Sequence, residues 1–156
     1  MPTHLENFQE AAHEAEAALC YRAKCGSIIV AEDGEVIGRG HNSPPNDDES
    51  QRTCNKEWDL SIKPKYDKTC CMHAEWNAVL DACKTSPDKI GGSTLYFMRI
   101  DEDGNFTDAG EPYCTTCSRL TLASGVGYFA VWDGGRPKIY TTPEYNQKSY
   151  DFYLRR

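Results

Sequence analysis

The sequence predicts an α/β fold, a three-layer α-β-α sandwich in which a mixed sheet lies between layers of helices. Two short runs with β-branched residues flank Asp33-Gly34, a pair typical of hairpin turns, so the sheet begins with antiparallel strands. Beyond this hairpin, helical and strand patterns alternate, which is typical of parallel strands joined by right-handed crossovers. The 156 residues contain no repeat or linker, so we expect a single domain over residues 1–156.

The chain is expected to begin with a helix that leads into the hairpin. Thr3 and Glu6 have the spacing of a capping box, and apolar residues then recur at steps of three and four, which predicts a helix over residues 3–23. Its expected apolar face comprises Leu5, Phe8, Ala12, Ala15 and Leu19. Residues 27–30 and 35–39 are the two expected strands of the hairpin.

The middle of the chain is a polar loop followed by a helix. Residues 42–69 contain three prolines and lack periodicity, and a stretch this long without regular structure is often a lid or a binding loop. A helix is expected over residues 73–84. Its expected core face comprises Trp76, Leu80 and Cys83.

The C-terminal half continues the alternation of strands and helices. We expect a strand over residues 94–100, an acidic turn over 101–110, a helix over 114–124 and a strand over 126–132. Leu120 and Ala123 are on a candidate core face of that helix, and Gly125 is placed to end it as a C-cap. Thr142 is expected to cap a last helix, with Pro143 at its first position.

The composition narrows the class of protein. A formal charge of −7 argues against a broad nucleic-acid surface, which is normally basic, and leaves a small molecule as the expected partner. The eight cysteines do not suggest a disulfide scaffold, because the chain is long and has no apolar N-terminal signal segment. No run approaches the roughly 18 apolar residues of a membrane helix. We therefore expect a cytoplasmic protein with reduced thiols and no membrane association.

Two short motifs carry the chemistry. His73-Ala74-Glu75 and Cys114-Thr115-Thr116-Cys117 together supply one imidazole and two thiols, three ligands for a tetrahedral zinc with a fourth position left open for water. Such a zinc lowers the pKa of its bound water and makes hydroxide available near neutral pH. Glu75 is the expected proton shuttle, and the combination is the signature of zinc-dependent base deaminases.

The spacing of these residues predicts where they lie. Residues two apart point to nearly opposite sides of a helix, so His73 and Glu75 can share a site only at a helix N-terminus. Cys114 and Cys117 are three apart, at the start of the next helix. We therefore expect two helix N-termini to converge on one metal, where unpaired N–H groups favour thiolates and hydroxide.

Other interpretations of these motifs stay open. A Cys-x-x-Cys pair also occurs in structural zinc sites and in thiol redox pairs. A non-catalytic, zinc-stabilised binding module would need no residue like Glu75. The same hydrolytic chemistry could also act on a purine, on another aminated heterocycle or on a nucleic-acid base.

The motifs resemble those of the cytidine and deoxycytidylate deaminase superfamily, and most closely its deoxycytidylate branch. The resemblance spans about residues 20–135 and rests on residues 71–78 and 111–117, with similarity also in residues 25–30 and 40–44. It implies a sheet of about five strands with helices on both sides, usually in a homo-oligomer. It also implies a cytosine-type nucleotide, nucleoside or base as substrate, with His73, Cys114 and Cys117 as zinc ligands and Glu75 as the proton shuttle.

The resemblance suggests further site residues and marks two departures. Asn42 matches a position that contacts the substrate's sugar or base, and the main chain around Ala74 would face the base. The family has proline directly before the first cysteine, whereas here Tyr113 separates Pro112 from Cys114. The long segment 101–111 before the motif is the second departure. The first departure affects the floor of the expected base pocket, and both bear on which substrate is expected.

Trp132, a group of cysteines and a basic loop are three further candidates for binding roles. Trp132 ends the last expected strand, where ligands bind in open α/β sheets, so it could contribute to substrate binding. Cys54, Cys70 and Cys71 could hold a second, structural zinc, although free buried cysteines are the alternative. The long loop is locally basic and could clamp a phosphate, with a solvated surface loop as the alternative; its cations are Arg52, Lys56, Lys63, Lys65 and Lys68.

Overall fold

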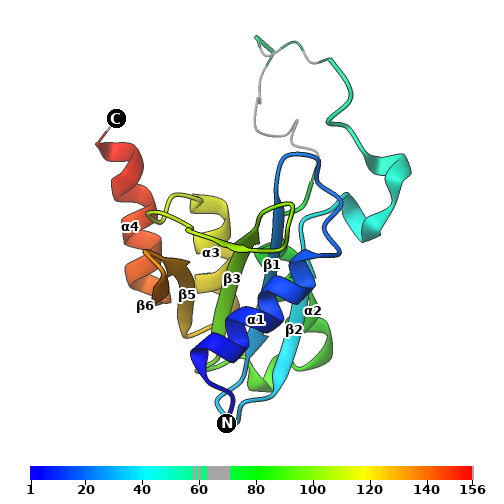
Figure 1. The fold of residues 1–156 in the computed structure, drawn as a ribbon. Helices are drawn as coiled ribbons and strands as arrows, with labels where there is room; N and C mark the ends of the chain where they lie inside the picture. The colour runs from blue at the N-terminus through cyan, green and yellow to red at the C-terminus, as the bar shows by residue number, and fades with distance from the viewer. Residues whose placement is uncertain (58, 60, 63–70, 156) are drawn as a thin grey trace.

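The computed structural model describes residues 1–57, 59, 61–62 and 71–155 (Figure 1). Its sheet has the strand order β2-β1-β3-β5-β6, with a short β4 paired to the free end of β3. β3 and β5 are parallel and the other pairs are antiparallel, so the predicted mixed α/β sheet is confirmed. The strands are β1 Lys24–Val30, β2 Val36–His41, β3 Thr94–Ile100, β4 Phe106–Thr107, β5 Tyr128–Asp133 and β6 Arg136–Thr141.

Helices cover both faces of this sheet and form the two outer layers (Figure 1). The helix α1 (His4–Ala15) packs on one face, where Phe8 and the alanines of α1 meet Ile28, Tyr96 and Met98. The helices α2 (Ala74–Thr85), α3 (Thr115–Ser124) and α4 (Thr142–Leu154) lie on the other face, and they contribute Val79, Leu120 and Tyr145 to a second apolar cluster. Single turns of 3-10 helix occur at Pro45–Asp47, Glu49–Gln51 and Pro87–Lys89.

The first helix has the predicted start but ends earlier than predicted. Both bonds of the capping box between Thr3 and Glu6 are present. The helix ends at Ala15 instead of residue 23, because the N–H groups of residues 16–18 bond carbonyls three residues back and the N–H of Leu19 donates to the carbonyl of Asn42, directly after β2. A contact distant in sequence therefore ends the helix where local propensity would continue it.

The close approach of α2 to β2 corrects the predicted core face of that helix. A Cβ on Gly40 would stand 2.4 Å from both the carbonyl oxygen of Ala74 and the amide nitrogen of Ala78, so only glycine fits there. The helix turns its alanines towards the strand. The buried residues of α2 are Ala74, Glu75, Ala78, Val79 and Ala82. The predicted core residues Leu80 and Cys83 are exposed and Trp76 is half-buried, so that prediction was wrong.

The C-terminal half follows the predicted order with local corrections. Gly125 has φ of 94° and ends α3 as predicted. On α3, Leu120 packs against the core as expected, whereas Ala123 is exposed. The last helix is capped by Thr141, whose hydroxyl accepts from the N–H of Glu144, and not by Thr142. The hydroxyl of Thr142 instead donates to the carbonyl of Val126, because Thr142 is buried against the start of β5.

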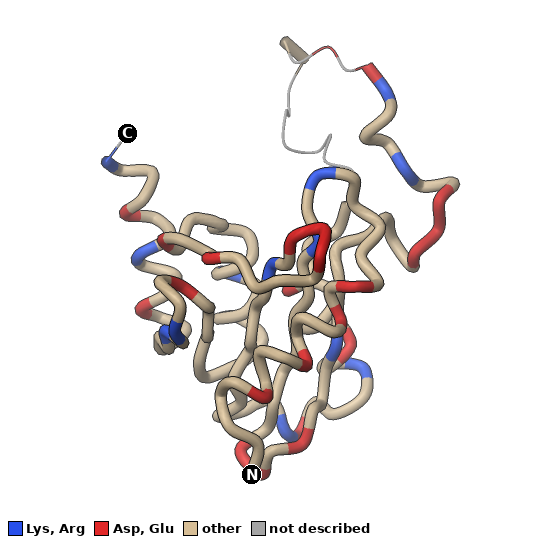
Figure 2. Tube along the Cα trace, in the orientation of Figure 1, with Lys and Arg blue, Asp and Glu red and all other residues tan. Residues whose placement is uncertain are grey.

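Two strands were not predicted. Residues 133–135 break β5 as expected, but the chain turns there and returns as the edge strand β6, whose sequence contains Pro137 and polar residues. Within the acidic excursion, Asp101 accepts from the N–H groups of Asp103 and Asn105, and this turn leads into β4. The acidic run is visible beside β3 in Figure 2.

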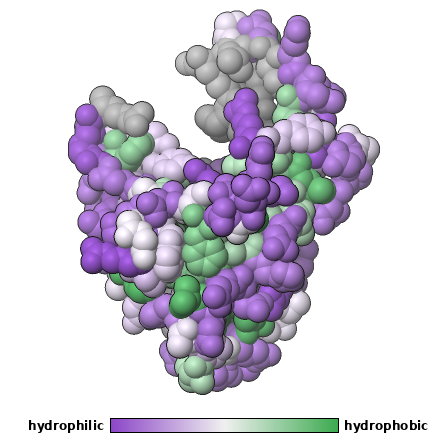
Figure 3. All heavy atoms as spheres, viewed as in Figure 1, coloured by the Kyte–Doolittle hydropathy of each residue, from purple (hydrophilic) through white to green (hydrophobic). Residues whose placement is uncertain are grey.

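The surface in the viewed orientation is mostly hydrophilic (Figure 3). The mean hydropathy of the chain, −0.67, agrees with this view. No helix within the described part of the chain is long and apolar enough to cross a membrane.

Candidate active site

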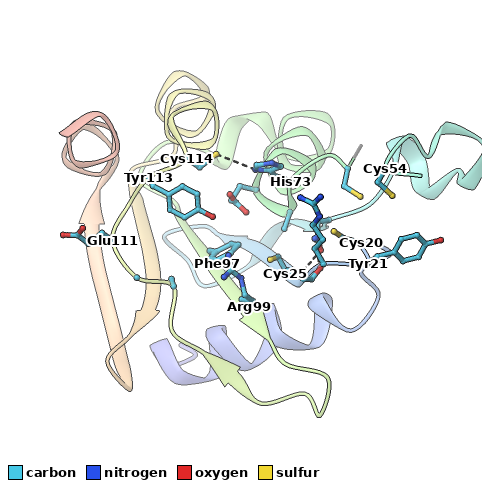
Figure 4. A pocket seen from close by; sticks show the side chains of 18 of the residues that line it. Cys20, Tyr21, Cys25, Cys54, His73, Phe97, Arg99, Glu111, Tyr113 and Cys114 are labelled. Carbon is cyan, nitrogen blue, oxygen red and sulfur yellow. Dashed lines mark hydrogen bonds between the residues drawn. The ribbon is translucent and has the colours of Figure 1, made fainter. Parts of the chain in front are cut away.

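The N-termini of α2 and α3 meet at one point, as the motif spacing predicted. His73 is the N-cap residue of α2, Cys114 is the N-cap residue of α3, and Cys117 lies in the first turn of α3. The Nδ1 atom of His73 is 3.1 Å from Sγ of Cys117 and 3.6 Å from Sγ of Cys114, and the two sulfurs are 2.8 Å apart. Figure 4 shows the contact between His73 and Cys114.

This cluster fits a tetrahedral metal ion. One imidazole nitrogen and two sulfurs lie within 4.8 Å of one another. Zinc–nitrogen and zinc–sulfur bond lengths place tetrahedral ligand atoms roughly 3.5–3.8 Å apart, so the sulfur pair would open by about 1 Å around an ion. The ring of His73 is stacked on the ring of Trp76, with centroids 4.3 Å apart and planes inclined by 6°, which fixes its orientation.

The two thiols differ in their surroundings. Burial raises the pKa of Cys117 well above its ordinary value. The hydrogen bond to Cys117, assisted by His73 and by the N–H of Cys117, lowers the pKa of Cys114 against the opposing effect of burial. That N–H lies 3.4 Å from Sγ of Cys114. The helix N-terminus therefore favours a thiolate at Cys114, the form in which cysteine binds metals.

Glu75 lies beside these three residues and is buried, with 7% of its surface exposed. It is in the first turn of α2, and its carboxyl hydrogen-bonds the thiol of Cys117. Burial raises the pKa of Glu75, with the Cys117 thiol opposing the shift. The buried carboxyl of Glu75 therefore holds its proton to a higher pH than an exposed carboxyl does.

A cavity of about 830 Å³ opens in front of the cluster (Figure 4). The predicted residues Ala74, Glu75, His73 and Cys114 line it, as does Asn42. The amide of Asn42 is held by two main-chain bonds, since its oxygen accepts from the N–H of Cys25 and its nitrogen donates to the carbonyl of Ala23, both at 2.9 Å. Asn42 therefore shapes the part of the wall made by Ala23 and Cys25.

The structure separates the remaining predicted residues. Trp132 does not line this cavity, because its ring packs edge-on against Phe8 and Phe106 in the core beneath α1. Cys54 and Cys71 line the cavity, whereas Cys70 lies outside the described residues. Within the described ranges, His73, Cys114 and Cys117 are the one group of three ligands close enough to share a metal.

The predicted basic loop is only partly described. Lys56 lines the cavity, whereas Lys63, Lys65 and Lys68 lie outside the described residues. Arg52 is not available for a ligand. Its guanidinium pairs with both carboxylate oxygens of Glu49 and donates to the carbonyl of Leu19.

Several cavity residues were not predicted as site residues, and Arg99, Tyr145 and Tyr113 are three of them. Arg99 on β3 and Tyr145 on α4 reach the cavity from elements distant in sequence, and no local motif marks them. Tyr145 is held by a parallel stack on Phe129, with ring centroids 3.8 Å apart. Tyr113, which departs from the family pattern, is 43% exposed and forms part of the wall. The extra residue is therefore a cavity residue, while Pro112 beside it is buried.

The molecule is an α/β sandwich in which one histidine and two cysteines, residue types that bind metals, meet a buried carboxylate at two helix N-termini. The model of the cytidine and deoxycytidylate deaminase zinc-binding region matches residues 1–132, and the chain belongs to this family of hydrolytic deaminases. A comparison with curated proteins gives no match.

Solved structures of other proteins have a similar fold. The dCMP deaminase of cyanophage S-TIM5 in apo form is 22% identical, with a TM-score of 0.52, over 83% of this chain and 82% of that one. A cytidine deaminase from Burkholderia pseudomallei is 16% identical, with a TM-score of 0.60, over 92% of this chain and 96% of that one. At these identities the likeness establishes the shared fold.

Proposed function

We propose that this chain is a zinc-dependent enzyme that hydrolyses the exocyclic amine of a cytosine-type nucleotide or nucleoside and releases ammonia. The observation that carries this proposal is the buried Glu75, which touches the ligand cluster without being one of its three ligands. A purely structural zinc site, as in a non-catalytic binding module, has no use for such a carboxylate.

His73, Cys114 and Cys117 would hold the zinc. When bound, zinc with an open fourth position supplies Lewis-acid chemistry that lowers the pKa of a water towards about 7. The N-termini of α2 and α3 both point at this position, and their unpaired N–H groups favour the negative charge that collects there.

Glu75 would move the protons. It accepts a proton from the attacking water and passes it to the ring nitrogen next to the amidine carbon under attack. It then takes the remaining proton from the added hydroxyl and delivers it to the departing amine as the C–N bond breaks, so that water and the aminated ring become the ring carbonyl and ammonia. General acid–base transfer of this kind typically contributes about 10²–10⁴-fold to the rate.

The cavity would position the substrate. Ala74 lines it from the first residue of α2, so main-chain N–H groups face a bound base. Asn42 supports the wall around residues 23–25, consistent with a role in placing the sugar or base. Trp132 packs in the core under α1, and this position does not support a role in substrate binding.

Three further proposals accompany this function. Cys54, Cys70 and Cys71 would form a second, structural zinc site, and Cys54 and Cys71 share the cavity wall. Metal analysis that gives one zinc per chain after dialysis would remove this site. We also propose that the enzyme is cytoplasmic and that it assembles as a homo-oligomer. Sedimentation of the purified chain tests the oligomeric state directly.

A substrate screen tests the proposed function. The zinc-loaded chain is incubated with dCMP, CMP, cytidine, deoxycytidine and cytosine, and ammonia release is measured together with the mass of the product. At least one substrate should release ammonia and gain about one dalton. If all five stay unchanged while zinc is bound, this function is wrong. Adenine and guanine compounds are included in the same screen, and ammonia release from one of them would favour the purine alternative.

A further inference from the structure

Arg99 places a cation in the wall of the cavity. Side chains alternate along β3, and Met98 points to the α1 face, whereas Phe97 and Arg99 both line the cavity on the opposite face. Arg99 lies directly across from Cys25 on β1. In Figure 4, Arg99 is beside Phe97 and Cys25, across the cavity from His73 and Cys114.

No carboxylate in the described part of the chain pairs with Arg99. Its side-chain partners are the thiol of Cys25 and the hydroxyl of Tyr113, and its buried Nε atom has no partner. The thiol does not neutralise the arginine at neutral pH, because burial raises the pKa of Cys25 to about 11. Since a guanidinium carries five donors and a permanent charge, this leaves hydrogen-bonding capacity for an anion.

Arg52 is a buried arginine with a structural role, and its guanidinium is hydrogen-bonded within the protein. The Arg52 side chain is 5% exposed and forms a two-pronged pair with Glu49, at 2.6 and 2.7 Å, plus a main-chain bond at 2.8 Å. Arg99 has the same kind of head group but only neutral partners. This contrast favours a ligand as the missing partner of Arg99.

The charges around the cavity favour an anionic ligand although the whole chain carries −7. The exposed cations Arg22 and Lys56 line the same cavity as Arg99. Of the two described carboxylates that line it, Glu75 lies against the ligand cluster and Glu111 is paired with Arg155 at 2.9 Å. The side of the cavity away from the cluster is therefore positive.

We propose that Arg99 is a specificity-determining residue that binds the phosphate of a 5′-nucleotide, so that this enzyme prefers the nucleotide to the neutral nucleoside. This inference rests on the proposed function, because it assigns the substrate of the same site. The phosphate of a nucleoside monophosphate carries about −1.5 to −2 charges at pH 7 and accepts the paired N–H groups of a guanidinium.

Equilibrium binding tests the inference without turnover. Dissociation constants for dCMP and deoxycytidine are measured by calorimetry on the zinc-loaded Glu75→Ala chain, with and without Arg99→Gln. The Glu75→Ala chain should bind dCMP more tightly than deoxycytidine. Adding Arg99→Gln should weaken dCMP binding about 10- to 150-fold, the range given by charge-assisted hydrogen bonds, and leave deoxycytidine within about threefold.

Two further variants sharpen the test. Arg99→Lys keeps the charge but loses the planar fork, so its preference for dCMP should be intermediate, and it serves also if Arg99→Gln folds poorly. Arg119→Gln is the matched control, because this exposed arginine of α3 stands over the ring of Tyr150 and does not line the cavity. It should leave both dissociation constants unchanged.

The outcomes separate this inference from the proposed function. Equal affinity for dCMP and deoxycytidine before the Arg99 change, or equal weakening of both ligands by Arg99→Gln, would overturn the phosphate role. If the wild-type chain turns over none of the substrates in the screen but Arg99→Gln still removes the preference for dCMP, the proposed chemistry is wrong and the phosphate site stands.

Discussion

A single methyl group on Gly40 should disturb the site without touching it. Gly40 lies under the first turns of α2, and a Cβ there would stand 2.4 Å from the carbonyl oxygen of Ala74 and from the amide nitrogen of Ala78. Ordinary van der Waals contact begins at 3.4 Å, so strand and helix must separate by about 1 Å in the Gly40→Ala variant. Both opposing atoms are main chain, which leaves no flexible side chain to absorb the strain.

The consequence should be larger for activity than for stability. Overpacking of this kind typically lowers the free energy of unfolding by about 1–3 kcal/mol. Ala74 lies between His73 and Glu75, so a displaced helix end moves the proposed zinc ligand and the proposed proton shuttle together. A misplacement of about 1 Å can cost about 10²-fold in rate, and we expect kcat/KM to fall by about that factor.

The assay combines ammonia release, zinc content and thermal unfolding. Gly91→Ala is the neutral control, because nothing lies within 4 Å of its Cβ position. Gly26→Ala is the steric control: its Cβ would meet the main chain of α1 at 2.2–2.4 Å, on the face of the sheet away from the site. It should lower stability comparably with a smaller loss of kcat/KM. If Gly40→Ala keeps kcat/KM within threefold, close packing of α2 does not position the site.

Two other predictions concern pH and metal. The ring of His41 bonds Glu14 at 2.9 Å and Asp47 at 2.8 Å, and the Glu14 contact raises the pKa of His41 against opposing burial. This stabilisation is complete below the unfolded pKa of about 6.5 and is lost as pH rises through the folded pKa. The free energy of chemical unfolding should therefore decline above pH ~6.5, and His41→Gln should flatten this decline. An unchanged pH profile in His41→Gln would refute this role of His41. Cys117→Ser should lower bound zinc well below one per chain and lower the Tm, whereas the exposed Cys83→Ser should change neither; full zinc in Cys117→Ser would contradict the ligand assignment.

The parts of the site that the sequence predicted are local. His73 and Cys114 are N-cap residues, and the rest of each motif lies within three positions of them, so helix geometry alone brings each half together. The capping box at Thr3 and the left-handed Gly125 were predictable for the same reason. Each depends on bonds or backbone angles within a few residues.

The parts that could not be predicted depend on contacts distant in sequence. The early end of α1 follows from a bond between Leu19 and Asn42. The core face of α2 is set by the fit of its alanines over Gly38 and Gly40. Apolar periodicity instead places the larger Leu80 on the core face, although Leu80 is exposed. Arg99 lines the cavity only because β3 pairs with β1 beneath the N-terminus of α2. No spacing along the chain records such a contact.

The Glu75→Gln variant of the zinc-loaded chain tests the proposed proton-transfer role of Glu75 most directly. This substitution keeps the size of the side chain, but the amide that replaces the carboxyl group cannot accept and return a proton. We expect one bound zinc, an unchanged fold and a loss of ammonia release of at least about 10²-fold on the best substrate of the screen. Wild-type turnover in a variant that retains its zinc would contradict the role of Glu75 and the mechanism built on it.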